Sequence, residues 1–203
     1  MAAMPLNLSD FDFHLPPELI AQEGLRERDQ ARLMVLESGG SAEHRTFSDL
    51  PEIFKAGDLL VLNDTRVARA RLWGKKDTGR KVDCLILSGT AGGENLEVML
   101  RGKRFNRGSV ITFTSPDGKT LTAEVLEWLG GAKYKLAFSD PSLITACAIL
   151  PLPPYIKKPL TEEGRYQTVY SKTEGSLAAP TAGLHFTPEL LKNLEARGIE
   201  TAF

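Results

Sequence analysis

Residues 172–189 concentrate the side chains that could do chemistry in this 203-residue chain. Glu174 and His185 can hold or transfer a proton, while Ser176 and Thr181 can donate hydrogen bonds. Glycines and a proline punctuate the segment, and it ends where a helix is predicted to begin. A polar loop that leads onto a helix N-terminus is a common form of ligand site, so the pattern predicts a substrate-binding loop.

A second polar group, Asn63 to Arg66, follows the apolar run of residues 58–63, which predicts a buried strand. Ligand groups of α/β proteins often gather at such strand ends. Asp64 could bind a hydroxyl or a cationic amine, and Arg66 could bind a carboxylate or phosphate through its planar fork. The alternative is structural, with an Asx turn closed by Asp64 and an ion pair made by Arg66.

A basic turn is predicted between two strands, because Arg101, Lys103, Arg104 and Arg107 fall within seven residues around Phe105. Such a turn could contact RNA phosphates while Phe105 stacks on a base. The alternative is a solvated loop with Phe105 tucked inward. Another charged cluster, residues 26–32, is expected to form a structural ion-pair network.

The middle of the chain has the texture of a small all-β unit. Residues 115–118, Ser-Pro-Asp-Gly, predict a hairpin turn between two of its short runs. Strands at this spacing predict a small antiparallel barrel or sandwich, and we favour the barrel. Residues 70–150 hold 12 Lys and Arg against 8 Asp and Glu, so the unit is mildly basic. The predicted strands are residues 82–87, 96–101, 109–113, 121–129 and 134–138.

Mixed helix and strand patterns on both sides predict an α/β main domain into which the β-barrel is inserted. The expected parts are residues 1–69 and 151–203 of the main domain and residues 70–150 of the barrel, with the proline-rich segment 151–157 as the return linker. Predicted flanking elements are a short helix from Pro16, a strand at 33–36, helices at 47–54 and 188–197, and a strand from 199.

Composition limits the function classes. The net charge of −1 gives no general attraction to nucleic acid or anionic membranes, and no apolar run is long enough to span a bilayer. The first residues lack the pattern of a secretory signal, and Cys84 and Cys147 lack metal-ligand spacing. We therefore expect a cytoplasmic protein with no metal site, in which the two cysteines are reduced core residues or, as the alternative, form a disulfide. We also expect a monomer.

Several segments, taken together and in order, resemble the S-adenosylmethionine:tRNA ribosyltransferase-isomerase family of queuosine biosynthesis. Members of that family continue well beyond the equivalent of Phe203, so the chain is expected to be an amino-terminal portion with an incomplete main domain. The segments that carry the resemblance are residues 11–22, 28–34, 57–67, 166–170 and 174–189.

The resemblance implies a transfer of the ribosyl part of S-adenosylmethionine onto 7-aminomethyl-7-deazaguanine in tRNA. The product would be epoxyqueuosine, with adenine and methionine released. S-Adenosylmethionine would then be a consumed substrate, and no cofactor is expected. The expected partners are S-adenosylmethionine and the tRNA that carries the modified base.

The same resemblance gives the candidate residues their roles. The implied chemistry needs a base for a proton made acidic by the adjacent sulfonium, and His185, Asp64 and Glu174 are the catalytic candidates. Asn63, Thr65, Arg66, Ser176 and Thr181 are expected to bind substrate, and the basic turn to bind tRNA. The alternatives are that His185 only fixes the loop, and that the chain is an RNA-binding module or an inactive fragment of the enzyme.

Overall fold

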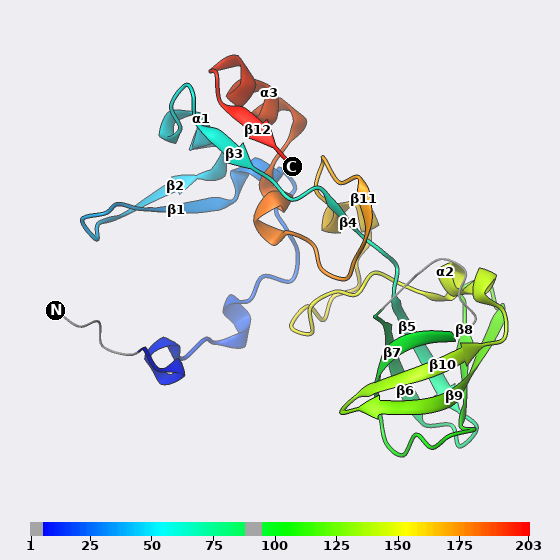
Figure 1. The fold of residues 1–203 in the computed structure, drawn as a ribbon. Coiled ribbons are helices and arrows are strands. Elements are labelled where there is room, and N and C mark those ends of the chain that lie inside the picture. Colours follow the sequence, from blue (N-terminus) through cyan, green and yellow to red (C-terminus); the bar gives the residue numbers. More distant parts are fainter. Residues whose placement is uncertain (1–5, 88–94) are drawn as a thin grey trace.

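In the computed structural model, which describes residues 6–87 and 95–203, the middle of the chain forms a closed, six-stranded antiparallel barrel (Figure 1). The barrel confirms the predicted class, in the place where the short apolar runs predicted it. Around the barrel the strands follow the order β10-β7-β6-β5-β8-β9. Their bounds are β5 Arg71–Lys76, β6 Lys81–Ile86, β7 Asn95–Arg101, β8 Val110–Thr114, β9 Thr120–Gly130 and β10 Lys133–Phe138.

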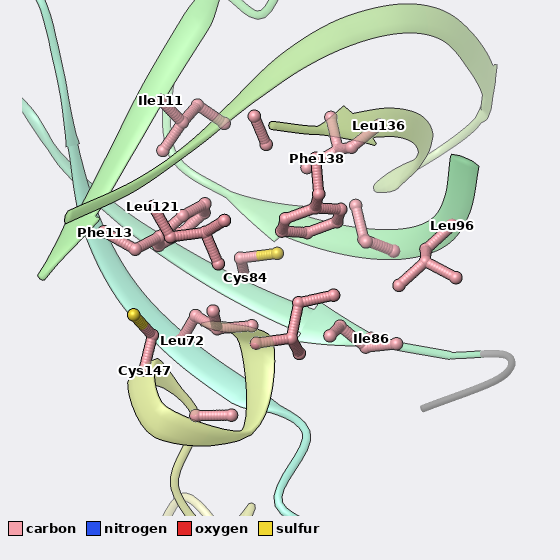
Figure 2. Packing of buried hydrophobic residues seen from close by; sticks show 14 of the residues in the cluster. Leu72, Cys84, Ile86, Leu96, Ile111, Phe113, Leu121, Leu136, Phe138 and Cys147 are labelled. Atoms are coloured by element: carbon pink, nitrogen blue, oxygen red, sulfur yellow. The ribbon is translucent and has the colours of Figure 1, made fainter. Parts of the chain in front are cut away.

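Alternation along each strand fills the barrel interior. In β6 every second residue, Val82, Cys84 and Ile86, is buried, because side chains of a strand point to opposite faces in turn. Figure 2 shows Cys84 and Ile86 in this core together with side chains of other strands, including Phe113 and Leu121. The short helices η5 (Pro141–Leu143) and α2 (Ile144–Cys147) follow β10 and add side chains to this core.

Strand β5 was not predicted. Its sequence, Arg-Leu-Trp-Gly-Lys-Lys, holds three cations and a glycine, so it lacks the apolar alternation of a strand. The structure explains the glycine, because a Cβ at Gly74 would lie 2.6 Å from the Phe113 ring. Gly74 therefore lets β5 pair closely with β8, where it lies opposite Phe113.

The hairpin predicted at residues 115–118 joins β8 to β9. Ser115 accepts a hydrogen bond from the Lys119 backbone amide at 2.9 Å, and Gly118 has a positive φ of 85°. Ser115 also donates a hydrogen bond to Asp117. These contacts close the turn, as the Pro-Asp-Gly sequence predicts.

Strands from before and after the barrel pair with each other. Strand β3 (Leu59–Val61) pairs in parallel with β12 (Glu200–Ala202), and β4 (Thr65–Val67) pairs in parallel with β11 (Thr173–Ser176). A hairpin of β1 (Arg32–Leu36) and β2 (Ala42–Thr46) precedes them. The two parallel pairs and short helices agree with the predicted mixture of helix and strand.

Helix α3 (Pro188–Ala196) begins and ends where the sequence predicts. The Leu190 amide donates a hydrogen bond to Thr187 Oγ1 at 3.1 Å, and Gly198 has a φ of 78° just beyond the helix. Leu190 and Leu194 bury the apolar face of α3 in a second core, separate from that of the barrel.

The remaining helical segments are short. The helix predicted at 47–54 is a 3-10 turn, η4 (Phe47–Asp49), that continues into α1 (Leu50–Ile53). The helix predicted from Pro16 is a single 3-10 turn, η2 (Pro17–Leu19). No helix of the described residues is long and apolar enough to cross a membrane. The other 3-10 turns are η1 Leu8–Phe11, η3 Arg28–Gln30, η6 Glu163–Tyr166 and η7 Thr181–His185.

The chain enters and leaves the barrel at one point. The backbone amides of Ala70 and Arg71 both donate to the Ile149 carbonyl at 3.1 Å, and the Ile149 amide donates to the Arg71 carbonyl at 2.8 Å. We call this contact the neck. At the neck, the segment that enters the barrel and the segment that leaves it lie side by side.

Candidate functional site

The pairing of β4 with β11 brings two of the predicted polar groups together. In this register Thr65 lies opposite Thr173, and Arg66 lies opposite Glu174. The register then shifts by one residue at Gly175, whose φ of 119° is easily reached by glycine. The segment predicted as a loop is therefore in part a strand, and its polarity hid the strand from the sequence pattern.

Arg66 and Glu174 place opposite charges next to each other on the surface. Arg66 Nε lies 4.0 Å from Glu174 Oε1, and Arg66 Nη1 donates a long hydrogen bond of 3.4 Å to Ser171 Oγ. The side chains are 49% and 76% exposed, so solvent screens the attraction and the pair adds little stability. Both charges consequently stay accessible to a ligand.

Asn63, not Asp64, closes the Asx turn that was one of the alternatives. The Thr65 amide donates to Asn63 Oδ1 at 2.9 Å. Asp64 contributes its backbone, because its carbonyl accepts from the amides of Lys172 at 2.7 Å and Thr173 at 3.2 Å. These bonds hold the half-buried Asp64 at the start of the paired segment and leave its carboxylate out of the backbone network.

The remaining loop candidates lie at the end of β11 and on η7. Ser176 donates to the Ala178 carbonyl at 2.7 Å and accepts from the Ala178 amide at 3.3 Å, so its hydroxyl satisfies loop backbone. Thr181 begins η7 and is exposed. His185 ends η7, and its half-buried ring packs 5.3 Å from the Phe47 ring. The structure therefore gives Ser176 and His185 structural contacts whether or not they touch a substrate.

Gly183 lets η7 approach the residues before β11. A Cβ at this position would collide with Tyr170 Oη and lie 3.0 Å from Thr168 Cγ2. Thr168 itself is buried, and among the described residues its hydroxyl has no hydrogen-bond partner. The glycine of the predicted loop thus serves close packing.

Arg28 acts differently from the expected ion-pair network. Its guanidinium donates to the carbonyls of Gly164 at 2.7 Å, Leu184 at 2.9 Å and Gln167 at 3.0 Å. Burial, and then the charge of nearby Arg165, lowers the pKa of Arg28 below its usual value. Arg28 therefore ties the amino-terminal segment to η6 and η7 through backbone oxygens and not through carboxylates.

Gln167 has a role that the sequence did not reveal. Its side-chain amide donates to the Val67 carbonyl and accepts from the Val67 amide, both at 2.9 Å, in a buried position. These two hydrogen bonds imitate the pairing of a neighbouring strand at the end of β4. A glutamine in a polar segment gives no sequence signal for such a contact.

The predicted basic turn lies on the barrel, with Arg101, Lys103, Arg104 and Arg107 all exposed. Phe105 is tucked inward, as the alternative held, and packs edge-on against the Tyr134 ring with 5.5 Å between ring centroids. Lys76 Nζ donates to the Arg104 carbonyl at 2.7 Å and helps to fix the turn. The turn therefore presents cations without an exposed aromatic ring.

The two cysteines are free and buried. Burial raises the pKa of the Cys84 and Cys147 thiols, so neither resembles an activated nucleophile. Among the residues that the structure describes, no group of three or more His, Cys, Asp or Glu side chains is placed to hold a metal ion.

Comparison with known proteins decides the family. A family model described as queuosine biosynthesis protein matches residues 8–203. The chain belongs to the queuosine biosynthesis protein family.

Curated relatives in this family are named S-adenosylmethionine:tRNA ribosyltransferase-isomerase. The relative from Desulforamulus reducens is 44% identical over 198 residues, which cover 96% of this chain and 58% of the relative. The relative from Staphylococcus epidermidis is 46% identical over 205 residues, covering 98% of this chain and 59% of the relative. The chain thus spans less than two thirds of the length of these relatives.

The chain is also similar to a solved structure, that of the S-adenosylmethionine tRNA ribosyltransferase from Thermotoga maritima. It is 30% identical in sequence and matches 95% of this chain and 56% of its own, with a TM-score of 0.38.

Proposed function

We propose that the chain is part of a tRNA-modifying transferase-isomerase that moves the ribosyl moiety of S-adenosylmethionine onto 7-aminomethyl-7-deazaguanine in tRNA. The reaction forms epoxyqueuosine and releases adenine and methionine. The observation that carries the proposal is the identity of 44–46% along nearly the whole chain to relatives that bear this enzyme name. In this proposal S-adenosylmethionine is consumed as a substrate, the protein needs no cofactor, and it acts as a cytoplasmic monomer.

The charge pair on β4 and β11 suits the amino-acid end of S-adenosylmethionine. That end carries a carboxylate and an ammonium group close together, and Arg66 and Glu174 present the opposite charges side by side. The guanidinium would bind the carboxylate through its planar fork, while the Glu174 carboxylate would face the ammonium or sulfonium. Asn63, Thr65, Ser176 and Thr181 complete the proposed substrate contacts.

Proton transfer in this proposal falls to His185, with Asp64 and Glu174 as the other candidates. An imidazole titrates near neutral pH, which suits a group that removes a proton made acidic by a neighbouring sulfonium. Packing against Phe47 would hold the ring of His185 in one orientation. The exposed cations Arg101, Lys103, Arg104 and Arg107 would contact tRNA phosphates.

The proposed architecture is an α/β main domain, residues 1–69 and 151–203, interrupted by the barrel of residues 70–150. The neck and the two parallel strand pairs support it. Chain from before the barrel pairs with chain from after it in both pairs, while the barrel is joined to the rest through residues 70 and 149. The main domain would be completed by further sequence of the family.

The test is adenine release from S-adenosylmethionine in the presence of tRNA that carries the aminomethyl base. We expect release that depends on this tRNA, from the chain itself or from the full-length Desulforamulus reducens relative. His185→Gln should lower turnover by about 100-fold or more, as loss of a general base does. The matched control is His44→Gln, which changes an exposed histidine of β2.

Three outcomes would contradict parts of the proposal. Full turnover in His185→Gln would remove the proton-transfer role of His185. Release by the relative alone would make this chain an inactive fragment. Binding of tRNA without adenine release from either protein would favour an RNA-binding module that uses the basic turn.

A further inference from the structure

A hollow of about 300 Å³ lies between the outer face of the barrel and the proline-rich segment that leaves it. None of the roles proposed above uses it as a binding site. Its lining comes from three strands of the barrel, from residues 151–154, from η6 and from the loop after β11. The hollow thus lies where the barrel meets the segment that carries the candidate site.

Strands β6 and β7 form one wall through outward-pointing apolar side chains. Leu85 lies directly opposite Met99 in the register, and both are half-buried. Their neighbours Cys84 and Leu100 point into the barrel core. The outer face of a barrel in water is usually polar. Two adjacent apolar residues there therefore indicate a surface that contacts a ligand or another part of the protein.

The opposite wall is built mainly from three prolines and a tyrosine. Pro151, Pro153 and Pro154 have fixed φ angles, and the Tyr166 ring is 9% exposed and packs in a small core of its own. Leu177 adds an aliphatic side chain from the loop after β11. A slot between an apolar strand face and stiff prolines is preformed for a flat ligand. Little conformational entropy is lost on binding, because few groups have to become ordered.

An ion pair among the lining residues supplies paired hydrogen-bonding groups. Arg71 Nε and Nη2 donate to the two oxygens of Asp83 at 2.9 and 2.7 Å, and Arg71 Nη1 donates to the Leu152 carbonyl at 3.1 Å. The side chains are only 17% and 13% exposed. Three of the five guanidinium N–H groups are used, so donors remain beside a carboxylate with lone pairs to spare.

We propose that this hollow binds a nucleobase, the planar heteroaromatic ring of a nucleoside. A base has flat faces for the apolar walls, and its edge carries a donor next to an acceptor, which complements Asp83 and Arg71. The volume is at the small end of ligand pockets and suits a ring of this size. Arg101, exposed and part of the lining, can bind a phosphate beside the base when the base belongs to RNA.

The inference rests on the proposed function for the source of the base. That function involves both a small adenine nucleoside, S-adenosylmethionine, and an RNA strand. The recognition chemistry is the same for either, so the test uses both sources. It measures binding and not turnover, and it can therefore succeed where catalysis fails.

The experiment is a calorimetric titration of the chain with adenosine, S-adenosylmethionine and a short single-stranded RNA, compared with Ala178→Phe. Ala178 is an exposed residue of the lining, so a phenyl ring there should fill the hollow without disturbing a core. We expect binding that Ala178→Phe weakens by roughly tenfold or more. Ala196→Phe, on the exposed face of α3, is the matched control and should leave the affinity unchanged.

A second variant and a reporter locate the ligand. Arg101→Ala should weaken the binding of RNA but leave the binding of adenosine and S-adenosylmethionine unchanged, because only RNA carries phosphates. Trp73, whose ring lies 5.1 Å from the Arg71 guanidinium, should lose fluorescence on binding in a Trp128→Phe background.

Each outcome decides the inference. Binding of the small nucleosides, or of RNA alone, with the expected loss in Ala178→Phe supports the hollow as a base site and identifies the source. Absence of binding by all three probes, or equal affinity in Ala178→Phe and Ala196→Phe, overturns it.

Discussion

Gln167 illustrates how one side chain can replace a strand. The backbone of Val67 at the end of β4 is buried, and Gln167 supplies both the donor and the acceptor that a neighbouring strand would have supplied. Buried backbone groups need such partners because an unsatisfied one costs about as much as a lost hydrogen bond. The order of β4, and of the charge pair at Arg66, therefore depends on a residue 100 positions away.

Removing this amide should destabilise the chain strongly. Gln167→Ala leaves the Val67 amide and carbonyl unpaired and buried, and each unpaired group costs about 1–3 kcal/mol. We expect the free energy of unfolding to fall by about 2–5 kcal/mol, measured by urea denaturation. Gln30→Ala, at an exposed position, should change it by less than about 0.5 kcal/mol. Equal effects of the two substitutions would refute the strand-like role of Gln167.

At the scale of elements, apolar alternation predicted what local sequence can determine. The five predicted barrel strands and helix α3 each carry their own pattern, so they could be located without knowledge of their partners. Strand β5 carries three cations and Gly74, and its place depends on Phe113 of the facing strand. Strand β11 is short and polar and exists only because β4 pairs with it. Such long-range pairing leaves no local signal.

The candidate site, too, was predictable only in those parts that depend on local sequence. The sequence located the polar residues of the β4–β11 pair, and the pairing that sets Arg66 beside Glu174 came from the structure. The hollow could not be predicted at all, since its walls come from segments distant in sequence. Arg101 is the one lining residue that was also predicted as a binding residue, as part of the basic turn.

The barrel should fold without the rest of the chain. Its core is continuous and separate from the other two buried clusters, and its strands close on themselves without a free edge. We expect residues 70–150 alone to unfold in one cooperative thermal transition, followed by circular dichroism. Phe113→Ala, which empties the barrel centre, should cost about 3–5 kcal/mol and abolish the transition. A gradual, non-cooperative melt of the unaltered segment would argue against an autonomous unit.

For the whole molecule, thiol and phenol groups whose pKa is raised by burial predict that the free energy of unfolding falls at alkaline pH. Burial raises the pKa of Cys84 in the barrel and, outside it, of Tyr166 and Tyr170. The unfolded chain loses these protons first, beginning with thiols at about pH 8.5. The free energy of unfolding is therefore independent of these groups below that pH and falls as the pH rises through it.

Urea midpoints at pH 7, 9 and 10 test this dependence. The Cys84 thiol alone should lower the stability by about 2 kcal/mol between pH 7 and pH 10. Cys84→Ala is less stable at pH 7 but should lose correspondingly less on going to pH 10. A Cys84→Ala variant with the same decline as the unaltered chain would show that the thiol is not responsible.

The neck at residues 70, 71 and 149 makes the whole barrel equivalent to a tight turn for the rest of the chain. The entropy of closing a loop depends on how its ends are brought together, and a folded barrel already holds its own ends within hydrogen-bonding distance. The barrel can therefore grow, shrink or be exchanged with little strain on the strands that it interrupts. Residues 69 and 150 are accordingly a natural graft site, where another module with adjacent termini, or a short hairpin, could be spliced in.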